Sequence, residues 1–197
     1  MMARTGRRRG NVDTKRQIVD VARAQFAELG YDGVSLRGIA RAAGVDPALV
    51  HHYFDGKSGL FADVMQLPVD PALALPIVLD GELDQLGERL LRFFIGLWES
   101  PETGPRMRAA FRTALSSEES SRRLGDFVAR EIMTRLAARL DSDRPQLRAT
   151  LTGSQLIGLA VGRYLVQVDP LTQASVEELV TATAPTLQRY LTGPLPS

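Results

Sequence analysis

The sequence predicts an all-α protein with two helical domains, and three observations lead to this prediction. Apolar residues recur at intervals of three and four positions along most of the chain, and no segment alternates as a half-buried strand does. A stretch with three prolines, residues 68–81, interrupts these helical patterns. Residues 35–54 contain two short helical patterns joined by a glycine, as in a helix-turn-helix. We therefore expect an N-terminal three-helix domain with a helix-turn-helix and a C-terminal helical domain.

Composition sets the expected domain boundaries. Residues 1–12 are rich in arginine and poor in apolar side chains, which predicts a flexible basic arm. Residues 13–67 hold the short helical patterns of the first domain. Because prolines disfavour a helix interior, we expect residues 68–81 to be a linker rather than one continuous helix. Residues 68–197 then form the second domain.

The overall composition excludes several classes of protein. Hydrophobic residues make up 44% of the 197 residues, which is ordinary for a folded domain, and cysteine is absent. No apolar run approaches the ~20 residues needed to cross a bilayer. The N-terminus also lacks the apolar segment of a secretory signal. We therefore expect a cytoplasmic protein with no membrane partner.

Charge is distributed unevenly along the chain. The first 60 residues contain ten basic and six acidic side chains, a formal charge of +4, although the whole chain carries only +1. A chance fluctuation of surface charge is one explanation. The other is a polyanionic partner for the N-terminal end, such as DNA.

The capping residues of the two short helices indicate a helix-turn-helix. Ser35 precedes the first short helix at the position of an N-cap. Gly44 lies where that helix ends, because glycine adopts the left-handed conformation without a steric cost. Asp46 offers a carboxylate to cap the second helix, and Pro47 follows at the first helical position. The second helix is expected to enter the major groove of DNA.

Two C-terminal segments, 145–167 and 175–191, are candidates for a subunit interface. Interior glycines weaken a helix by about 1 kcal/mol each, so three of them in the first segment suggest close helix contacts. Such contacts could equally lie inside one subunit. The second segment begins with a capping box and contains a proline expected to kink it. The predicted interface residues are Gly153, Gly158, Gly162, Pro185, Leu187 and Tyr190.

With these residues in view, the chain resembles the tetracycline-repressor (TetR) family of bacterial transcriptional regulators. The resemblance covers residues 12–67 and lies in ARAQFAELGYDGVSLRGIARAAGV and VHHYFDGKSGLF. The strings GSQLIGLAVGRY and APTLQRYLTG extend it to the second domain. It implies a homodimeric repressor that binds a palindromic operator and is released by a small-molecule effector bound in the C-terminal domain.

The resemblance also implies which residues contact DNA. These are Ser35, Arg37, Pro47, Ala48, Leu49, His51, His52 and Lys57. Two positions depart from the common family pattern, with Asp46 replacing a capping Ser or Thr and His51 replacing a Tyr that contacts phosphate. Because Pro47, Ala48 and Leu49 carry no side-chain donors, we expect them to contact thymine methyl groups. Arg37 and His52 are then the candidates for hydrogen bonds to bases.

Two other functions compete with DNA binding. An enzyme is disfavoured, because the sequence has no P-loop, no nucleophile elbow and no metal-ligand spacing. The adjacent His51 and His52 point about 100° apart on a helix, so they cannot chelate one ion. We therefore predict no catalytic residues, no metal and no cofactor. The other alternative is a helical ligand- or partner-binding protein whose helix-turn-helix has lost its function.

Aromatic and apolar side chains in the second domain exceed what a minimal four-helix core needs. They suggest an effector pocket with two polar anchors, although ordinary core packing explains any single one of them equally well. Arg163 could bind an anionic effector. A buried ion pair with Glu131 or Asp169 would explain this arginine equally well. The predicted pocket residues are Phe93, Phe94, Leu97, Trp98, Met107, Phe111, Leu115, Gln155, Leu159 and Arg163.

Overall fold

The computed structural model describes residues 6–195, with side chains from residue 13 onward. Every regular element in this range is helical, which confirms the all-α prediction. The chain divides into two compact units, Met1–Asp70 and Pro71–Ser197. Within the described range, no helix combines the length and apolar character that crossing a bilayer requires.

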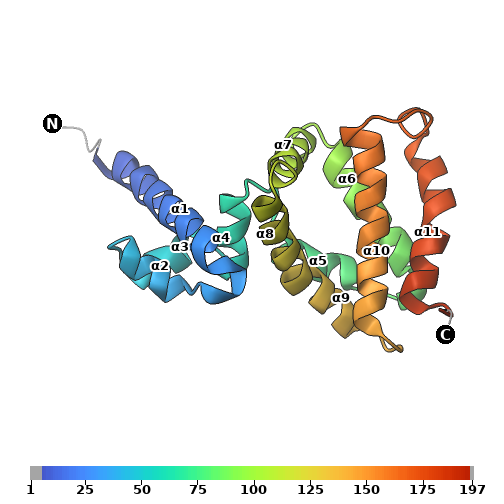
Figure 1. Cartoon of the computed structure of the whole chain (residues 1–197), viewed down its shortest axis with the longest axis horizontal. Helices are drawn as coiled ribbons and strands as arrows, with labels where there is room; N and C mark the ends of the chain where they lie inside the picture. The colour runs from blue at the N-terminus through green and yellow to red at the C-terminus, as the bar shows by residue number, and fades with distance from the viewer. Residues whose placement is uncertain (1–5, 196–197) are drawn as a thin grey trace. The chain divides into compact units, whose positions relative to one another are not determined.

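Between residues 6 and 70, the first unit contains the helices α1 to α4 (Figure 1). They are α1 (Gly6–Gly33), α2 (Leu36–Ala42), α3 (Pro47–Tyr53) and α4 (Gly56–Val64). An aromatic trio ties the end of α1 to α4, because the rings of Tyr31 and Phe26 both meet Phe61 edge-on, at 5.1 and 4.9 Å between centroids. All three side chains are buried. This core holds the short helices in place.

Helix α1 extends further toward the N-terminus than the sequence pattern suggests. It begins at Gly6, so residues 6–12 of the expected flexible arm are helical, and residues 1–5 lie outside the described residues. Arginine is a good helix former, and each residue added to an existing helix gains a backbone hydrogen bond. At the other end of α1, Gly30 has φ 71° and interrupts the helix.

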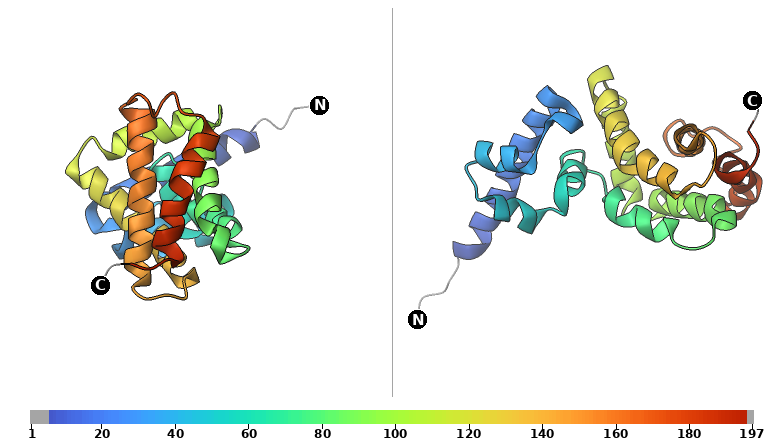
Figure 2. Two further views of the ribbon diagram at one scale, coloured as in Figure 1. Left: turned by 90° about the vertical axis from the view of Figure 1, so that its right-hand side faces the viewer. Right: turned by 90° about the horizontal axis from the view of Figure 1, so that it is seen from below.

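The second unit is a bundle of longer helices. Its elements are α5 (Pro71–Leu79), a 3-10 turn (Leu83–Gln85), α6 (Leu86–Glu99), α7 (Gly104–Ala114), α8 (Glu118–Val128), a π-helical turn (Ala129–Met133), α9 (Thr134–Arg139), α10 (Pro145–Ala160), a second π-helical turn (Val161–Leu165) and α11 (Val176–Thr192). Helices α10 and α11 lie side by side on one face of the bundle (Figure 2).

Helix α5 corrects the expectation of a linker at 68–81. Pro76 lies inside the helix, although proline lacks the N–H that this position needs. It is the sixth of nine residues, so its missing N–H removes one i→i−4 backbone hydrogen bond from the helix interior. Leu75 and Val78 are buried against Leu86 and Leu90 of α6. The burial of these apolar side chains offsets the cost of the proline.

Helix α6 connects three apolar clusters that follow one another along the bundle. Leu86 and Leu90 belong to the first cluster, with α5, α9 and the end of α11. Leu91 and Ile95 belong to the second, which also contains Leu159. Its last turn contributes Trp98 to the third. One face of α6 therefore spans the whole core of the second unit.

A buried arginine fastens the end of α11 to the start of α10. Arg148 is only 3% exposed. It donates to the carbonyl oxygens of Tyr190 and Gly193 at 2.9 and 2.8 Å, and to the Asp143 main-chain oxygen and carboxylate at 2.7 and 2.5 Å. Arg148 and, secondarily, Arg144 lower the pKa of Asp143 by hydrogen bonding to its ionised carboxylate. The Asp143 contribution to stability is therefore present at neutral pH and declines as the pH falls through this lowered pKa.

Replacing Arg148 by Met is expected to lower the free energy of unfolding by about 2–4 kcal/mol, because two carbonyl groups lose their donors. Urea unfolding of the full chain at neutral pH measures the change. The exposed Arg112, changed in the same way, is the matched control and should shift stability by less than about 0.5 kcal/mol. An equal effect of both substitutions would contradict this role of Arg148.

Candidate DNA interface and effector-binding core

The helix-turn-helix forms as its capping residues predict. Ser35 Oγ accepts a hydrogen bond from the Gly38 N–H at 3.1 Å and caps α2. The turn passes through Gly44 at φ +64°. Asp46 Oδ1 then accepts from the Ala48 N–H at 2.7 Å, with the proline in the first turn of α3. The local geometry of the motif is therefore confirmed.

Helix α3 is anchored by one side and exposed on the other. Val50 is fully buried, and Phe54, directly after the helix, is 5% exposed. The residues of α3 that are predicted to contact DNA are all exposed, and they are Pro47, Ala48, Leu49, His51 and His52. A short helix fixed by a buried anchor can present such a face without bending.

The predicted polar contacts lie on the neighbouring helices. Ser35 and Arg37 are exposed on α2, and Ser35 is already used as a cap. Lys57, in the first turn of α4, lies with its Nζ 4.5 Å from the centre of the Tyr31 ring. It also donates to the Asp32 carbonyl oxygen at 3.4 Å. The ring and the carbonyl hold the ammonium group at the surface near the start of α4.

The aromatic cluster at the end of α6 contains about half of the predicted pocket. Trp98 stacks on Tyr164 with centroids 5.1 Å apart, and Phe111 meets it edge-on at 5.0 Å. The predicted residues in this cluster are Phe94, Leu97, Trp98, Met107 and Phe111. These side chains come from α6 and α7, and Tyr164 comes from the π-helical turn after α10.

The other predicted pocket residues lie elsewhere. Leu159 packs in the neighbouring cluster with Leu91 and Ile95. Phe93, Leu115 and Gln155 are exposed, because the buried faces of their helices turn away from them. The structure therefore does not bring these four residues into the aromatic cluster.

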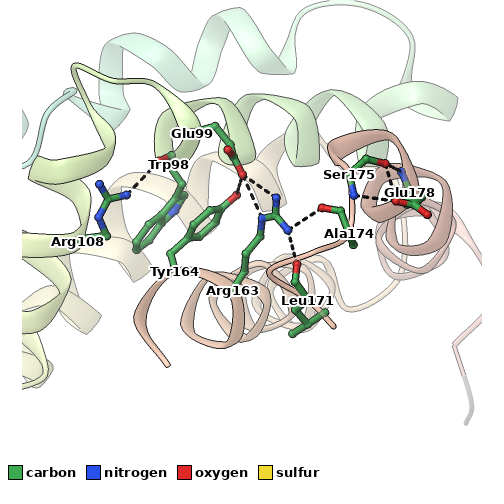
Figure 3. Close-up of polar contacts among 9 residues, drawn as sticks. All are labelled: Trp98, Glu99, Arg108, Arg163, Tyr164, Leu171, Ala174, Ser175 and Glu178. Carbon is green, nitrogen blue, oxygen red and sulfur yellow. Dashed lines mark hydrogen bonds and ion pairs between the residues drawn. The ribbon is translucent and has the colours of Figure 1, made fainter. Parts of the chain in front are cut away.

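Arg163 is held in a network that the sequence did not reveal (Figure 3). Its Nε and Nη2 donate to Glu99 Oε1 at 3.1 and 3.0 Å, and its Nη1 donates to the carbonyls of Leu171 and Ala174. The hydroxyl of Tyr164 donates to the same Glu99 oxygen at 2.8 Å. The ion pair of Arg163 is therefore with Glu99, which lies 64 residues away in the chain, and not with Glu131 or Asp169 as considered from the sequence. Arg163 is thus a structural anchor of the 166–174 loop.

Burial and hydrogen bonding fix the protonation of this network. Burial raises the pKa of the Tyr164 hydroxyl, and the nearby Glu99 carboxylate raises it further. Burial lowers the pKa of Arg163, but the hydrogen bonds and charge interactions with Glu99 and Tyr164 together outweigh this effect, so the net shift of the pKa is upward. Tyr164 therefore remains a donor and Arg163 remains charged at neutral pH.

The glycines of α10 fall into two groups. A Cβ at Gly153 would lie 2.9 Å from Met133 Cε, and one at Gly162 would lie 2.8 Å from Leu171 Cδ1. Contacts inside the chain thus account for both. Gly158 has no heavy atom within 4 Å of a Cβ position, and it faces outward.

On α11 the predicted interface residues differ in exposure. Pro185 is exposed and Tyr190 is half-buried. Leu187 is 0% exposed, which corrects its assignment, because it packs within the chain and offers no surface to a partner.

Two family models match this chain. Residues 18–64 match the bacterial regulatory proteins of the tetR family, and residues 84–191 match the tetracyclin repressor-like C-terminal domain. The two matches cover the helix-turn-helix and the aromatic core described above. The chain belongs to the TetR family. It is therefore a DNA-binding transcriptional regulator.

Other transcriptional regulators are similar to most of this chain in sequence or in structure. The HTH-type transcriptional regulator BetI of Serratia proteamaculans is 24% identical over 170 residues, which cover 77% of this chain and 79% of BetI. The fatty acid degradation regulator FadR of Bacillus halodurans is 14% identical, with a TM-score of 0.51 over 89% of this chain and 94% of FadR. A transcriptional regulator from Rhodococcus sp. Rha1 is 24% identical, with a TM-score of 0.50 over 92% and 99%. The two structures show the fold.

The Asp46 cap gives a direct test of how this TetR-family chain fixes α3. Changing Asp46 to Ala is expected to lower the opening free energy of α3 by about 1 kcal/mol, because the first N–H groups lose their acceptor. Hydrogen exchange of the Ala48 amide measures it. Asp46→Ser, which retains a capping oxygen, is the control. If the Ala48 amide exchanged at the same rate in all three proteins, the cap would have no energetic role.

Proposed function

We propose that this TetR-family regulator is a cytoplasmic homodimeric repressor that binds a palindromic operator through α3 and is released by a small-molecule effector. The observation that carries the proposal is the capped, anchored α3 with its exposed outer face. A helix held in this way can enter the major groove as a rigid element.

Base recognition is divided between apolar and polar side chains. Pro47, Ala48 and Leu49 have no side-chain donors and contact thymine methyl groups. Arg37 and His52 supply the hydrogen bonds that distinguish one base pair from another. Arg37 is exposed and makes no hydrogen bond or ion pair with another described residue, so its guanidinium is available for a base edge.

Backbone phosphates are bound at the edges of this face. Ser35, His51 and Lys57 are the proposed contacts. The Lys57 ammonium is already oriented by the Tyr31 ring and the Asp32 carbonyl, so little side-chain freedom is lost on binding. The Asp46 carboxylate accepts from the helix N-terminus, which reduces its repulsion of phosphate.

Selection of binding sequences from random duplex DNA, followed by fluorescence anisotropy at several salt concentrations, tests DNA recognition. We expect a palindromic site whose affinity falls steeply with salt. Changing Arg37 to Ala should cost about 1–3 kcal/mol and relax the preference at one base pair in each half-site. Changing Lys57 to Ala should weaken binding to all DNA sequences alike. It should also reduce the slope of log affinity against log salt concentration by about 1.

The exposed Arg112 of the other unit is the matched control and should change neither quantity when replaced by Ala. Affinity that does not depend on salt would contradict the proposal. So would an Arg37→Ala protein with unchanged sequence preference.

The effector site is proposed in the aromatic cluster around Trp98. Large apolar side chains together with a few polar groups are typical of small-molecule sites between helices. The cluster includes the half-buried Phe94 and Phe111, so it reaches the surface of the unit. Binding there would favour a dimer whose two α3 helices are no longer one DNA turn apart.

The dimer interface is proposed on the outer face of α10 and α11. Leu147 and Ile157 on α10 are 44% and 39% exposed, and Gly158 leaves room for a second helix beside them. Pro185 lies on the outer face of α11. The same surface on two copies forms a two-fold interface.

Changing Gly158 to Leu is expected to dissociate the dimer, because the added side chain occupies the space of the partner helix. Within the chain the substitution meets no atom within 4 Å of the new Cβ. Gly125→Leu on α8 is the matched control, since that position is equally open. Sedimentation should give the monomer mass for the first variant alone. A dimer mass for both would place the interface elsewhere.

A further inference from the structure

The only tryptophan of the chain carries an unsatisfied hydrogen-bond donor. Trp98 is 1% exposed, and its indole Nε1 is buried with no partner among the described residues. A buried N–H without an acceptor destabilises a folded protein, because it has lost its hydrogen bond to water and gained none in return. Such a group needs an explanation, and a ligand that brings an acceptor is one.

The surroundings of Trp98 are apolar and partly open. Tyr164 covers one face of the ring, and Phe94 and Phe111 pack against it at angles of about 60°. Phe94 and Phe111 are half-buried, and Leu115, one turn beyond Phe111, is 59% exposed. Rotation of these two partly exposed phenyl groups would uncover the Trp98 ring to an apolar molecule.

The charges nearby are not balanced. Arg163 and Glu99 neutralise each other, and Tyr164 donates to the same carboxylate. Arg108 of α7 is half-buried, and its one hydrogen bond among the described residues, at 3.5 Å, goes to the main-chain oxygen of Trp98. No carboxylate of the described residues lies within ion-pair distance of Arg108. In the view of Figure 3, Arg108 and Tyr164 lie on opposite sides of Trp98.

We propose that the effector is an apolar organic acid bound as its anion, whose carboxylate accepts from Trp98 Nε1 and pairs with Arg108. This assignment rests on the proposed effector site in the same cluster. The apolar body replaces the phenyl groups that rotate away, and the charged oxygen satisfies the buried donor. A hydrogen bond to a charged acceptor is about twice as strong as a neutral one, so the anion binds in preference to its amide.

Nuclear magnetic resonance of the 15N-labelled full chain tests the proposal, because a single tryptophan gives a single indole N–H signal. The probes are benzoate, 2-naphthoate and decanoate, each compared with its amide up to about 10 mM. We expect at least one carboxylate to move the indole proton signal downfield as the hydrogen bond forms. Its amide should bind at least about tenfold more weakly.

Two variants assign the contacts. Trp98→Phe keeps an aromatic ring without the N–H, and it should lower the affinity for the carboxylate about tenfold or more. Binding to this variant is followed through the methyl signals of the cluster. Arg108→Gln should weaken the carboxylate and leave the amide unchanged. Arg112→Gln, one turn further along α7 and exposed, should affect neither.

The proposal is overturned if none of the three carboxylates moves the indole signal, or if acid and amide bind equally. It is also overturned if an internal water molecule already accepts a hydrogen bond from the indole N–H in the free protein. Operator binding by the same preparations separates this result from the proposed function. If the protein binds its operator but none of the carboxylates, the proposed class of effector is wrong. If it binds no duplex DNA, the proposed repressor function is wrong.

Discussion

The anchoring of α3 is the constraint on which the function of this chain depends. A seven-residue helix is far too short to be stable alone in water, where isolated helices of fewer than ~12 residues are marginal. Asp46 supplies an acceptor for its first turn, and Val50 buries its inner side. With both in place, the outer side chains are presented by a fixed backbone. The aromatic trio joins α1 to α4 within the same unit.

The second unit is built around α6 in a comparable way. One face of that helix joins three apolar clusters, and its last turn ends in Trp98 and Glu99. Trp98 closes the aromatic cluster, whereas Glu99 holds Arg163 and Tyr164 from the π-helical turn after α10. Trp98 is therefore directly followed in the chain by Glu99, the residue that holds the turn at the end of α10. The proposed effector site and the proposed dimer face are thus linked through adjacent residues of α6 and the turn after α10.

Sequence reasoning succeeded where neighbouring residues determine the structure. The caps at Ser35 and Asp46, the turn at Gly44 and the capping box at Ser175 each depend on residues within about four positions. It failed where the partner is distant in the chain. Nothing in the sequence pairs Arg163 with Glu99 or places Leu171 over Gly162. Exposure was equally hard to infer, because Phe93 and Phe94 are neighbours and only one of them belongs to the aromatic cluster. Helix α5 formed across Pro76 because tertiary burial outweighed the local preference.

Hydroxyl-radical footprinting of the selected operator tests whether two copies of α3 bind a two-fold symmetric site. The account predicts two protected segments related by the dyad of the site, with centres one helical turn of about 10 base pairs, or a multiple of it, apart. Protection of a single segment, or of segments without that symmetry, would contradict it.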